Sequence, residues 1–366
     1  MKKIIQRFLR KKHFIKLLNQ LRGAKKLKLE GDPFFVLNSM NDLSNIPLGI
    51  SKKDFPKILI GQHNSVAEVV LRQNILIEFT KFSSTLMQCI GSGEALSLPI
   101  PPSWVNQLKS NGINCSAKNC KVKLYLKALV KIIIGSLKFL NLLFQINNLK
   151  FSGSPYVVFL GLQQENLPES NMENKGHDLI TWYKQSKIYN NKIKQIWAQV
   201  FDTNDYIPPD YLKISKNIFP RINSFTSYMG FIFTSILAIL YSLIGLFRGK
   251  WWYGYIIPET INLNYVKSLQ KNHLAYEYFF SNSNHFYKPL WTYEVENINS
   301  LITQFYYSTN NENYILNEYK FKGFPGYEIM KWKRFVVWDK TQEDHLKQFC
   351  PNSIYIKVGY VDIVGS

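Results

Sequence analysis

Two neighbouring side chains, His177 and Asp178, form a pair suited to moving a proton. They follow a β-branched and aromatic run at 155–162, PYVVFLGL, which predicts a central strand with a functional loop at its carboxyl end. A carboxylate or imidazole in such a loop can take a proton from a hydroxyl group, and we favour Asp178 as the base with His177 as an orienting group. The alternative is that Asp178 caps the helix that follows, because Asp is a preferred N-cap residue before an apolar run.

A second constellation consists of His63 and Glu68. They lie in the segment 57–79, KILIGQHNSVAEVVLRQNILIEF, which predicts a short buried strand, a Gly-containing turn, a helix and another strand. The loop after that first strand would open on the same cleft as His177, which makes His63 a candidate catalytic residue and Glu68 a candidate substrate ligand. Asn64 or Ser65 is suited equally well to cap the helix.

A third group lies in the segment 288–296, KPLWTYEVE, which predicts a strand. Alternation along a strand would place Glu294 and Glu296 on one face, where two carboxylates can bind a metal ion or a substrate, although solvated strand glutamates are commoner. Trp291 can serve as an aromatic platform for a carbohydrate or at a lipid interface, but at such spacings tryptophan more often belongs to the core. We name Glu294 and Trp291 as candidate substrate-binding residues.

No metal site or cofactor is predicted. Cys115 and Cys120 are spaced more widely than a usual zinc knuckle and lack a second ligand pair, and the DTND sequence at 202–205 has its two carboxylates three residues apart before a Pro-Pro loop. The chain also lacks a P-loop, a GxSxG elbow, an HExxH pair and a GxGxxG fingerprint, which excludes the usual hydrolase, NTPase and dinucleotide-binding interpretations. Four scattered cysteines indicate reduced thiols in the cytoplasm.

The chain is strongly basic, with 45 Lys and Arg against 25 Asp and Glu and a formal net charge of +20. Such an excess favours a polyanionic partner: nucleic acid, an anionic membrane surface or a phosphate-bearing donor. No zinc finger, RNP-type motif or basic zipper is present, so nucleic acid is not expected.

Two segments are candidates for membrane contact. Residues 1–30 form a basic amphipathic segment without the apolar core of a signal peptide; it fits an interfacial helix or an ordinary helix packed on the domain. Residues 229–247, MGFIFTSILAILYSLIGLF, lack any charge and are followed by Arg248 and Lys250. This second segment fits a buried or membrane-dipping helix or a true span, and we favour the first because a span would separate the elements on its two sides.

An α/β fold is expected because predicted strands alternate with predicted helices. With 46% hydrophobic residues, a chain of 366 residues can bury one large core or two smaller ones. We expect helices at 103–110, 121–144 and 264–283, strands at 155–162, 288–296 and 301–310, a strand or helix edge at 191–202, and a strand followed by a helix at 333–349.

Several stretches, taken in their order, resemble a family of surface-polysaccharide biosynthesis proteins that look like glycosyltransferases of the two-Rossmann-domain (GT-B) type. The resemblance covers most of the chain from about residue 58 onward. It is carried by GQHNSVAEV at 61–69, SLPIPPSWVNQLKSNGINC at 97–115, HDLITWY at 177–183, GKWWYGYIIPETI at 249–261, KPLWTYEVE at 288–296, FYYSTN at 305–310, VVWDKTQEDHL at 336–346 and YIKVGYVDI at 355–363.

The resemblance implies a domain organisation. Residues 31–335 would form a Rossmann-like acceptor-side domain, and residues 336–366 the linker and first strand of an incomplete C-terminal domain. The domain that binds the nucleotide-sugar would be largely missing, so the chain alone is expected to be inactive.

The resemblance also implies a function: transfer of a sugar from a nucleotide-sugar to a glycan or lipid-linked acceptor in cell-surface polysaccharide synthesis. The expected location is the cytoplasmic face of the plasma membrane, on anionic lipid. The alternative is a non-catalytic membrane-associated scaffold of a polysaccharide assembly complex.

Overall fold

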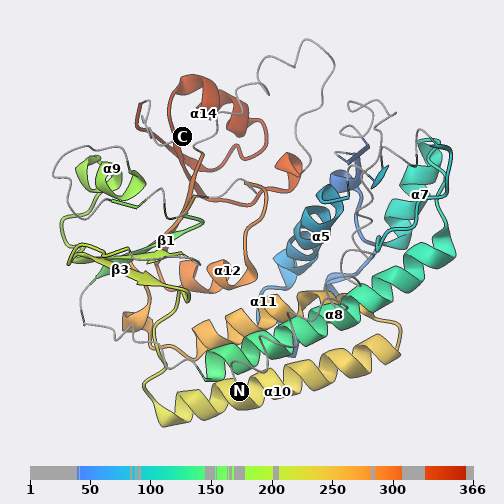
Figure 1. The fold of residues 1–366 in the computed structure, drawn as a ribbon, viewed down its shortest axis with the longest axis horizontal. Helices are drawn as coiled ribbons and strands as arrows, with labels where there is room; N and C mark the ends of the chain where they lie inside the picture. The colour runs from blue at the N-terminus through green and yellow to red at the C-terminus, as the bar shows by residue number, and fades with distance from the viewer. Residues whose placement is uncertain are drawn as a thin grey trace.

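A seven-stranded, wholly parallel β-sheet organises the computed structural model (Figure 1). The model describes residues 39–40, 42–82, 85–86, 89, 92–144, 153, 155–162, 164, 167–168, 178–200, 206–281, 285–306 and 326–359. The expected N-terminal segment 1–30, His177 and the DTND sequence lie outside these described residues. The strands are β1 (Tyr156–Leu160), β2 (Gln195–Gln199), β3 (Leu212–Ser215), β4 (Glu277–Phe280), β5 (Leu301–Phe305), β6 (Arg334–Val337) and β7 (Ile354–Lys357).

The strand order is β3-β2-β1-β4-β5-β6-β7. The chain therefore builds outward from β1 to β3, returns to the other side of β1 with β4, and continues outward to β7. This is the order of doubly wound Rossmann-like sheets, with a topological switch point between β1 and β4. The expected α/β, Rossmann-like class is confirmed.

Burial explains the composition of the two strands at the switch point. Every residue of β1, YVVFL, and of β4, EYFF, is buried, because helices cover both faces of the sheet there. Parallel strands covered on both faces are near-continuous apolar runs rather than alternating ones. The expected central strand at 155–162 is thus confirmed as β1.

Several other sequence predictions are confirmed. The helices α7 (Pro102–Ser110) and α8 (Ala117–Leu143) form where they were expected. The expected strand at 301–310 forms β5, the segment 333–349 forms β6 followed by α14 (Lys340–Lys347), and the segment 191–202 contains β2.

Three segments differ from expectation. Residues 57–79 form two helices, α4 (Lys57–Ile60) and α5 (Asn64–Thr80), instead of strands on either side of one helix. Residues 290–296 form helix α12 (Leu290–Glu296) with Pro289 at its N-cap, instead of a strand. The end of the predicted helix 264–283 forms β4.

All three differences have one physical cause. Short apolar runs bury well in either conformation, and periodicity alone does not separate them. In α5 the buried positions Ala67, Val70, Leu71 and Leu76 follow helical spacing, so the tertiary contacts select the helix.

Helices cover the two faces of the sheet unequally. Among the described residues, α9 (Leu179–Gln185) packs on the face that carries Val157, Phe159 and Phe279. The opposite face carries Tyr156, Tyr278 and Phe280 and packs against the larger helical layer. That layer contains α5, α11 (Trp251–Lys267) and α12, and beyond α11 the long helices α8 and α10 (Phe225–Phe247) lie side by side at the periphery (Figure 1). The 3-10 turns are η1 (Lys52–Asp54), η3 (Lys271–His273) and η5 (Tyr327–Ile329).

The expected domain boundary at residue 336 lies inside β6. Within the described part of the segment 336–366, α14 packs on the sheet and β7 pairs in parallel with β6. These residues therefore extend the same seven-stranded sheet to its edge.

Close approach between α8 and α11 depends on Gly254. An added Cβ at Gly254 would lie 2.6 Å from the backbone oxygen of Ala128, whereas an added Cβ at Gly230 on α10 meets nothing within 4 Å. A backbone atom cannot move out of the way as the end of a side chain can, so a Cβ at Gly254 would force α8 and α11 apart.

We therefore expect Gly254→Ala to lower the free energy of unfolding by about 1–3 kcal/mol. The matched change Gly230→Ala should raise it by up to about 1 kcal/mol, because alanine has the higher helix propensity. Urea unfolding followed by circular dichroism measures both, and equal effects of the two changes would contradict the proposed packing.

Candidate functional site

The structure brings His63 and Glu294 together from opposite ends of the chain. His63 is the N-cap residue of α5, Glu294 lies on α12, and the distance from His63 Nε2 to Glu294 Oε2 is 2.8 Å. His63 is buried, with 6% of its surface exposed, while the Glu294 side chain is 22% exposed. The pair therefore has a buried imidazole and a carboxylate that reaches solvent.

Lys267 completes the cluster. It is the last residue of α11, its Nζ lies 3.9 Å from Glu294 Oε2, and its side chain is 34% exposed. Gly61 leaves room for it: an added Cβ there would lie 2.1 Å from Lys267 Nζ, and the φ of +60° at Gly61 is one that glycine adopts most readily. We call His63, Lys267 and Glu294 the His63 cluster.

The hydrogen bond defines the roles of the two ring nitrogens. A carboxylate only accepts, so His63 donates Nε2–H to Glu294 and its Nδ1 carries the lone pair in the neutral ring. Among the described residues Nδ1 has no hydrogen-bond partner. A neutral imidazole that a carboxylate orients through one ring nitrogen can accept a proton from a substrate hydroxyl at the other nitrogen.

Glu294 is held in its ionised form. The hydrogen bond from His63 lowers the pKa of Glu294 below its ordinary value of 4.5, and this effect together with the nearby Lys267 outweighs the opposing effect of burial. Glu294 is thus suited to orient His63 and to stabilise positive charge on it, and not to donate a proton at neutral pH.

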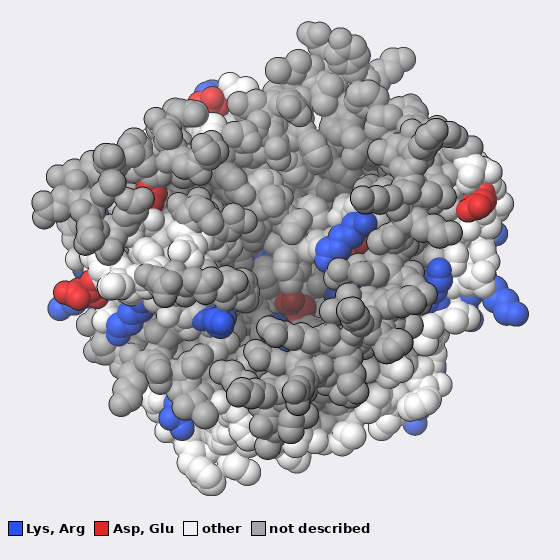
Figure 2. Space-filling model, in the orientation of Figure 1, with Lys and Arg blue, Asp and Glu red and all other residues white. Residues whose placement is uncertain are grey.

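Acidic and basic side chains are visible near the middle of the face shown in Figure 2. In the same orientation, Figure 1 has α5, α11 and α12 meeting near that place. These are the three helices that carry the His63 cluster, which fits the partial exposure of Glu294 and Lys267.

The other predicted site residues have structural partners. Asp178 is the N-cap of α9, and its carboxylate accepts a hydrogen bond of 2.8 Å from Thr181 N–H, as in the capping alternative. Glu68 accepts hydrogen bonds from Leu48 N–H and from the Arg72 guanidinium, which ties α5 to the segment before it. Neither residue lies in the His63 cluster.

Trp291 belongs to the core. Its ring is 2% exposed and packs against Phe219, Tyr278 and Phe280, so neither face is open to a ligand.

The expected carboxylate pair on one strand face does not form, because residues 290–296 are helical. Glu294 points to His63, whereas Glu296 pairs with the buried Lys288 at 2.6 Å. Burial lowers the pKa of Lys288 to about 8 despite that pairing.

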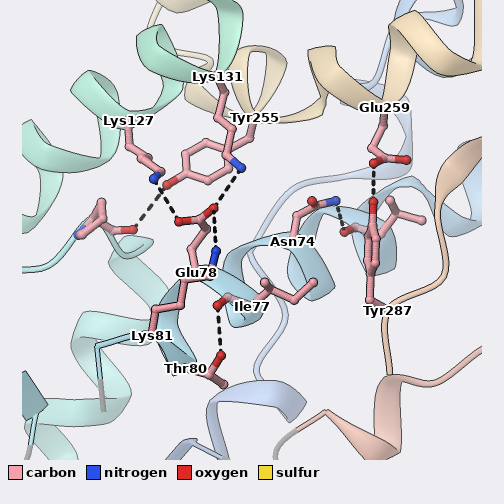
Figure 3. A network of polar contacts seen from close by, with 12 residues as sticks. Asn74, Ile77, Glu78, Thr80, Lys81, Lys127, Lys131, Tyr255, Glu259 and Tyr287 are labelled. Carbon is pink, nitrogen blue, oxygen red and sulfur yellow. Dashed lines mark hydrogen bonds and ion pairs between the residues drawn. The ribbon is translucent and has the colours of Figure 1, made fainter. Parts of the chain in front are cut away.

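Sequence reasoning did not find Lys267 or Glu78. Glu78 near the end of α5 faces three lysines, Lys127, Lys131 and Lys81, at 2.9, 3.1 and 3.8 Å (Figure 3). Burial raises the pKa of Glu78, but Lys131 and Lys127 outweigh it and hold that pKa at about 2. No sequence signal marks either residue, because the partners lie on other helices.

The usual ligand crevice of such a sheet lies at the carboxyl ends of β1 and β4. The described residues there include Gly161, Ser281 and His285. Burial lowers the pKa of His285 to about 4, so this imidazole stays neutral at physiological pH. The His63 cluster lies in the helical layer and not at this edge.

Residues 229–361 match a family model described as "Polysaccharide biosynthesis PFTS motif protein". The match covers less than half of the chain and supports a role in polysaccharide biosynthesis. It contains Lys267 and Glu294, whereas His63 lies before it. No curated protein and no solved structure was found to match the chain.

The lowered pKa of Glu294 predicts a pH-dependent contribution to stability. Ionisation of Glu294 is favoured in the folded state, so its contribution is fully present above about pH 4.5 and is lost as the pH falls through the lower folded-state pKa. We expect Glu294→Gln to destabilise the protein at pH 7 and to lose this effect in acid, measured as the difference in free energy of unfolding from the unmodified protein.

The exposed Glu328 supplies the control. Glu328→Gln should change the free energy of unfolding little at either pH. A Glu294→Gln effect that is independent of pH would show that the ionised carboxylate does not stabilise the fold.

Proposed function

We propose that this protein is the acceptor-side part of a glycosyltransferase of cell-surface polysaccharide biosynthesis. The substrates would be a nucleotide-sugar donor and a glycan or lipid-linked acceptor. The work would take place at the cytoplasmic face of the membrane, on anionic lipid. The family match supports a role in polysaccharide biosynthesis, and the Rossmann-like sheet is compatible with a glycosyltransferase.

The observation that carries the proposal is the hydrogen bond between His63 and Glu294. Sugar transfer to a hydroxyl requires a base within hydrogen-bond reach of the acceptor oxygen. His63 Nδ1 takes this role: it accepts the proton of the acceptor hydroxyl as the glycosidic bond forms and the bond between the sugar and the nucleotide phosphate breaks. The nucleotide leaves with the electron pair of that bond, and the ionised Glu294 stabilises the resulting imidazolium. Lys267 is placed to bind an anionic group of the acceptor.

This assignment replaces Asp178 as the proposed base. The Asp178 carboxylate is engaged as the cap of α9, whereas no described residue bonds to the Nδ1 of His63. A free and oriented base is the better catalyst.

The test is transfer of radiolabelled sugar from a panel of nucleotide-sugars to lipid and glycan acceptors, with the full chain in native membranes. We expect His63→Gln to lower kcat/KM by at least about 100-fold, the usual contribution of a general base. Glu294→Gln should lower kcat, because the imidazole loses the charged partner that orients it.

Glu328→Gln is the matched control and should leave the rate unchanged. Unchanged transfer by His63→Gln would exclude this base. Absence of transfer by the unmodified chain in these membranes, for every nucleotide-sugar of the panel, would overturn the transferase function and leave the scaffold alternative.

A further inference from the structure

Helices α8 and α10 form an antiparallel pair on the outside of the molecule. Tyr125 OH on α8 donates to Gly249 O just after α10 at 2.6 Å, and Tyr228 OH on α10 donates to Leu143 O near the end of α8 at 3.0 Å. These two bonds join the start of each helix to the end of the other. The two helices therefore lie side by side over most of their length.

The face of α10 that meets the protein carries Phe231 and, after it, only small residues. Ser235, Ala238, Ser242 and Gly245 are buried, and an added Cβ at Gly245 would lie 2.1 Å from the Tyr253 ring on α11. Small residues facing a neighbouring helix and large apolar residues facing outward form a pattern typical of helices in lipid.

The outward face of the pair is apolar and exposed. On α8 it includes Leu126, Leu129 and Ile133, which are 49%, 40% and 48% exposed. On α10 it includes Phe233, Leu240 and Phe247, which are 65%, 50% and 89% exposed. No described element covers these residues, and large apolar side chains gathered on one exposed face mark an interaction surface.

The lysines of α8 do not interrupt this face, because four of them bond inward. Lys127 and Lys131 reach Glu78 (Figure 3), Lys123 donates to Ser97 O, and Lys138 donates to Pro258 O. A helix that carries many lysines in its sequence thus presents an apolar stripe to the outside.

The charges at the ends of α8 and α10 indicate which partner the apolar face contacts. Lys118 and Lys121 begin α8 beside the end of α10, where Arg248 and Lys250 follow, and Arg221 precedes α10 at the opposite end. The apolar face is therefore bounded by cations at both ends, which suits a bilayer with anionic headgroups.

We propose that α8 and α10 together form a membrane-docking face that lies in the plane of the bilayer interface, with α10 embedded along its length and not spanning. By length and composition α10 could cross a membrane, and only 28% of its most apolar stretch is buried in the protein, which leaves most of that stretch open to lipid. Its inner face packs on α11, and both of its ends are tied to the same α/β body, by Tyr265 OH to Pro220 O before it and by Tyr125 OH to Gly249 O after it. A span would have to carry one of these ends across the bilayer.

The inference rests on the membrane location in the proposed function, and not on sugar transfer. Flotation of the purified full chain with vesicles of equal parts phosphatidylcholine and phosphatidylglycerol tests it separately from activity. We expect the double variant Leu129→Glu and Leu240→Glu to lower the bound-to-free ratio at least about tenfold, since charge is costly at the acyl boundary.

The matched control places the same charges on exposed apolar residues elsewhere. Ile207 and Ile354 are 72% and 63% exposed, so Ile207→Glu with Ile354→Glu should leave flotation unchanged. Equal flotation of both double variants would overturn the proposed face. Dependence on phosphatidylglycerol should be weakened when Arg248 and Lys250 become Gln, because Lys118, Lys121 and Arg221 remain.

A depth measurement separates docking in the plane from spanning. Single cysteines that replace Thr226, Ile236 and Phe247 carry an environment-sensitive label, while Cys89, Cys115, Cys120 and Cys350 are buried. Quenching by nitroxides at shallow and deep acyl positions should give one common depth for the three labels. A label at residue 236 much deeper than those at 226 and 247 would show a span and overturn the in-plane arrangement.

Discussion

The carboxylate of Glu259 on α11 accepts a hydrogen bond from Leu290 N–H, the first residue of α12, and another from Tyr287 OH. The N–H groups in the first turn of a helix lack partners within the helix, and the N-cap residue Pro289 supplies no side-chain acceptor for them. The carboxylate of Glu259 accepts a hydrogen bond from one of these N–H groups, that of Leu290. Thr260, the next residue of α11, donates to Leu59 O on α4. One turn of a buried helix thus fixes α12, which carries Glu294, and α4, which ends three residues before His63.

Helix α11 is central because it is buried along almost its whole length. Towards the sheet it contacts α12, and on its other side it meets α8 and α10 at distances that only small residues allow, as at Gly135, Gly245 and Gly254. The same helix ends at Lys267 in the His63 cluster. The proposed membrane face and the proposed catalytic cluster are therefore connected through one helix.

Electrostatics determine which side of α8 faces outward. Glu78 draws Lys127 and Lys131 toward α5, and its pKa of about 2 shows how strongly the two cations favour its ionised form. With the lysines so engaged, the large apolar residues of α8 are left on the outside. The rotation of α8 that pairs its lysines with Glu78 is thus the same rotation that places its large apolar residues on the outside.

The sequence by itself determined much of the local structure. The β-branched run of β1, the Asp178 cap and the helical periods of α7 and α8 follow from short-range sterics and burial, and they form where they were predicted. The α/β class and the strand–helix unit of β6 and α14 were predictable for the same reason. Only the tertiary structure decided that the segments 57–79 and 290–296 are helices, because short apolar runs suit both conformations. It also decided that His63 meets Glu294 across 231 residues and that α8 turns its lysines inward, since both depend on partners from distant helices that no local pattern specifies.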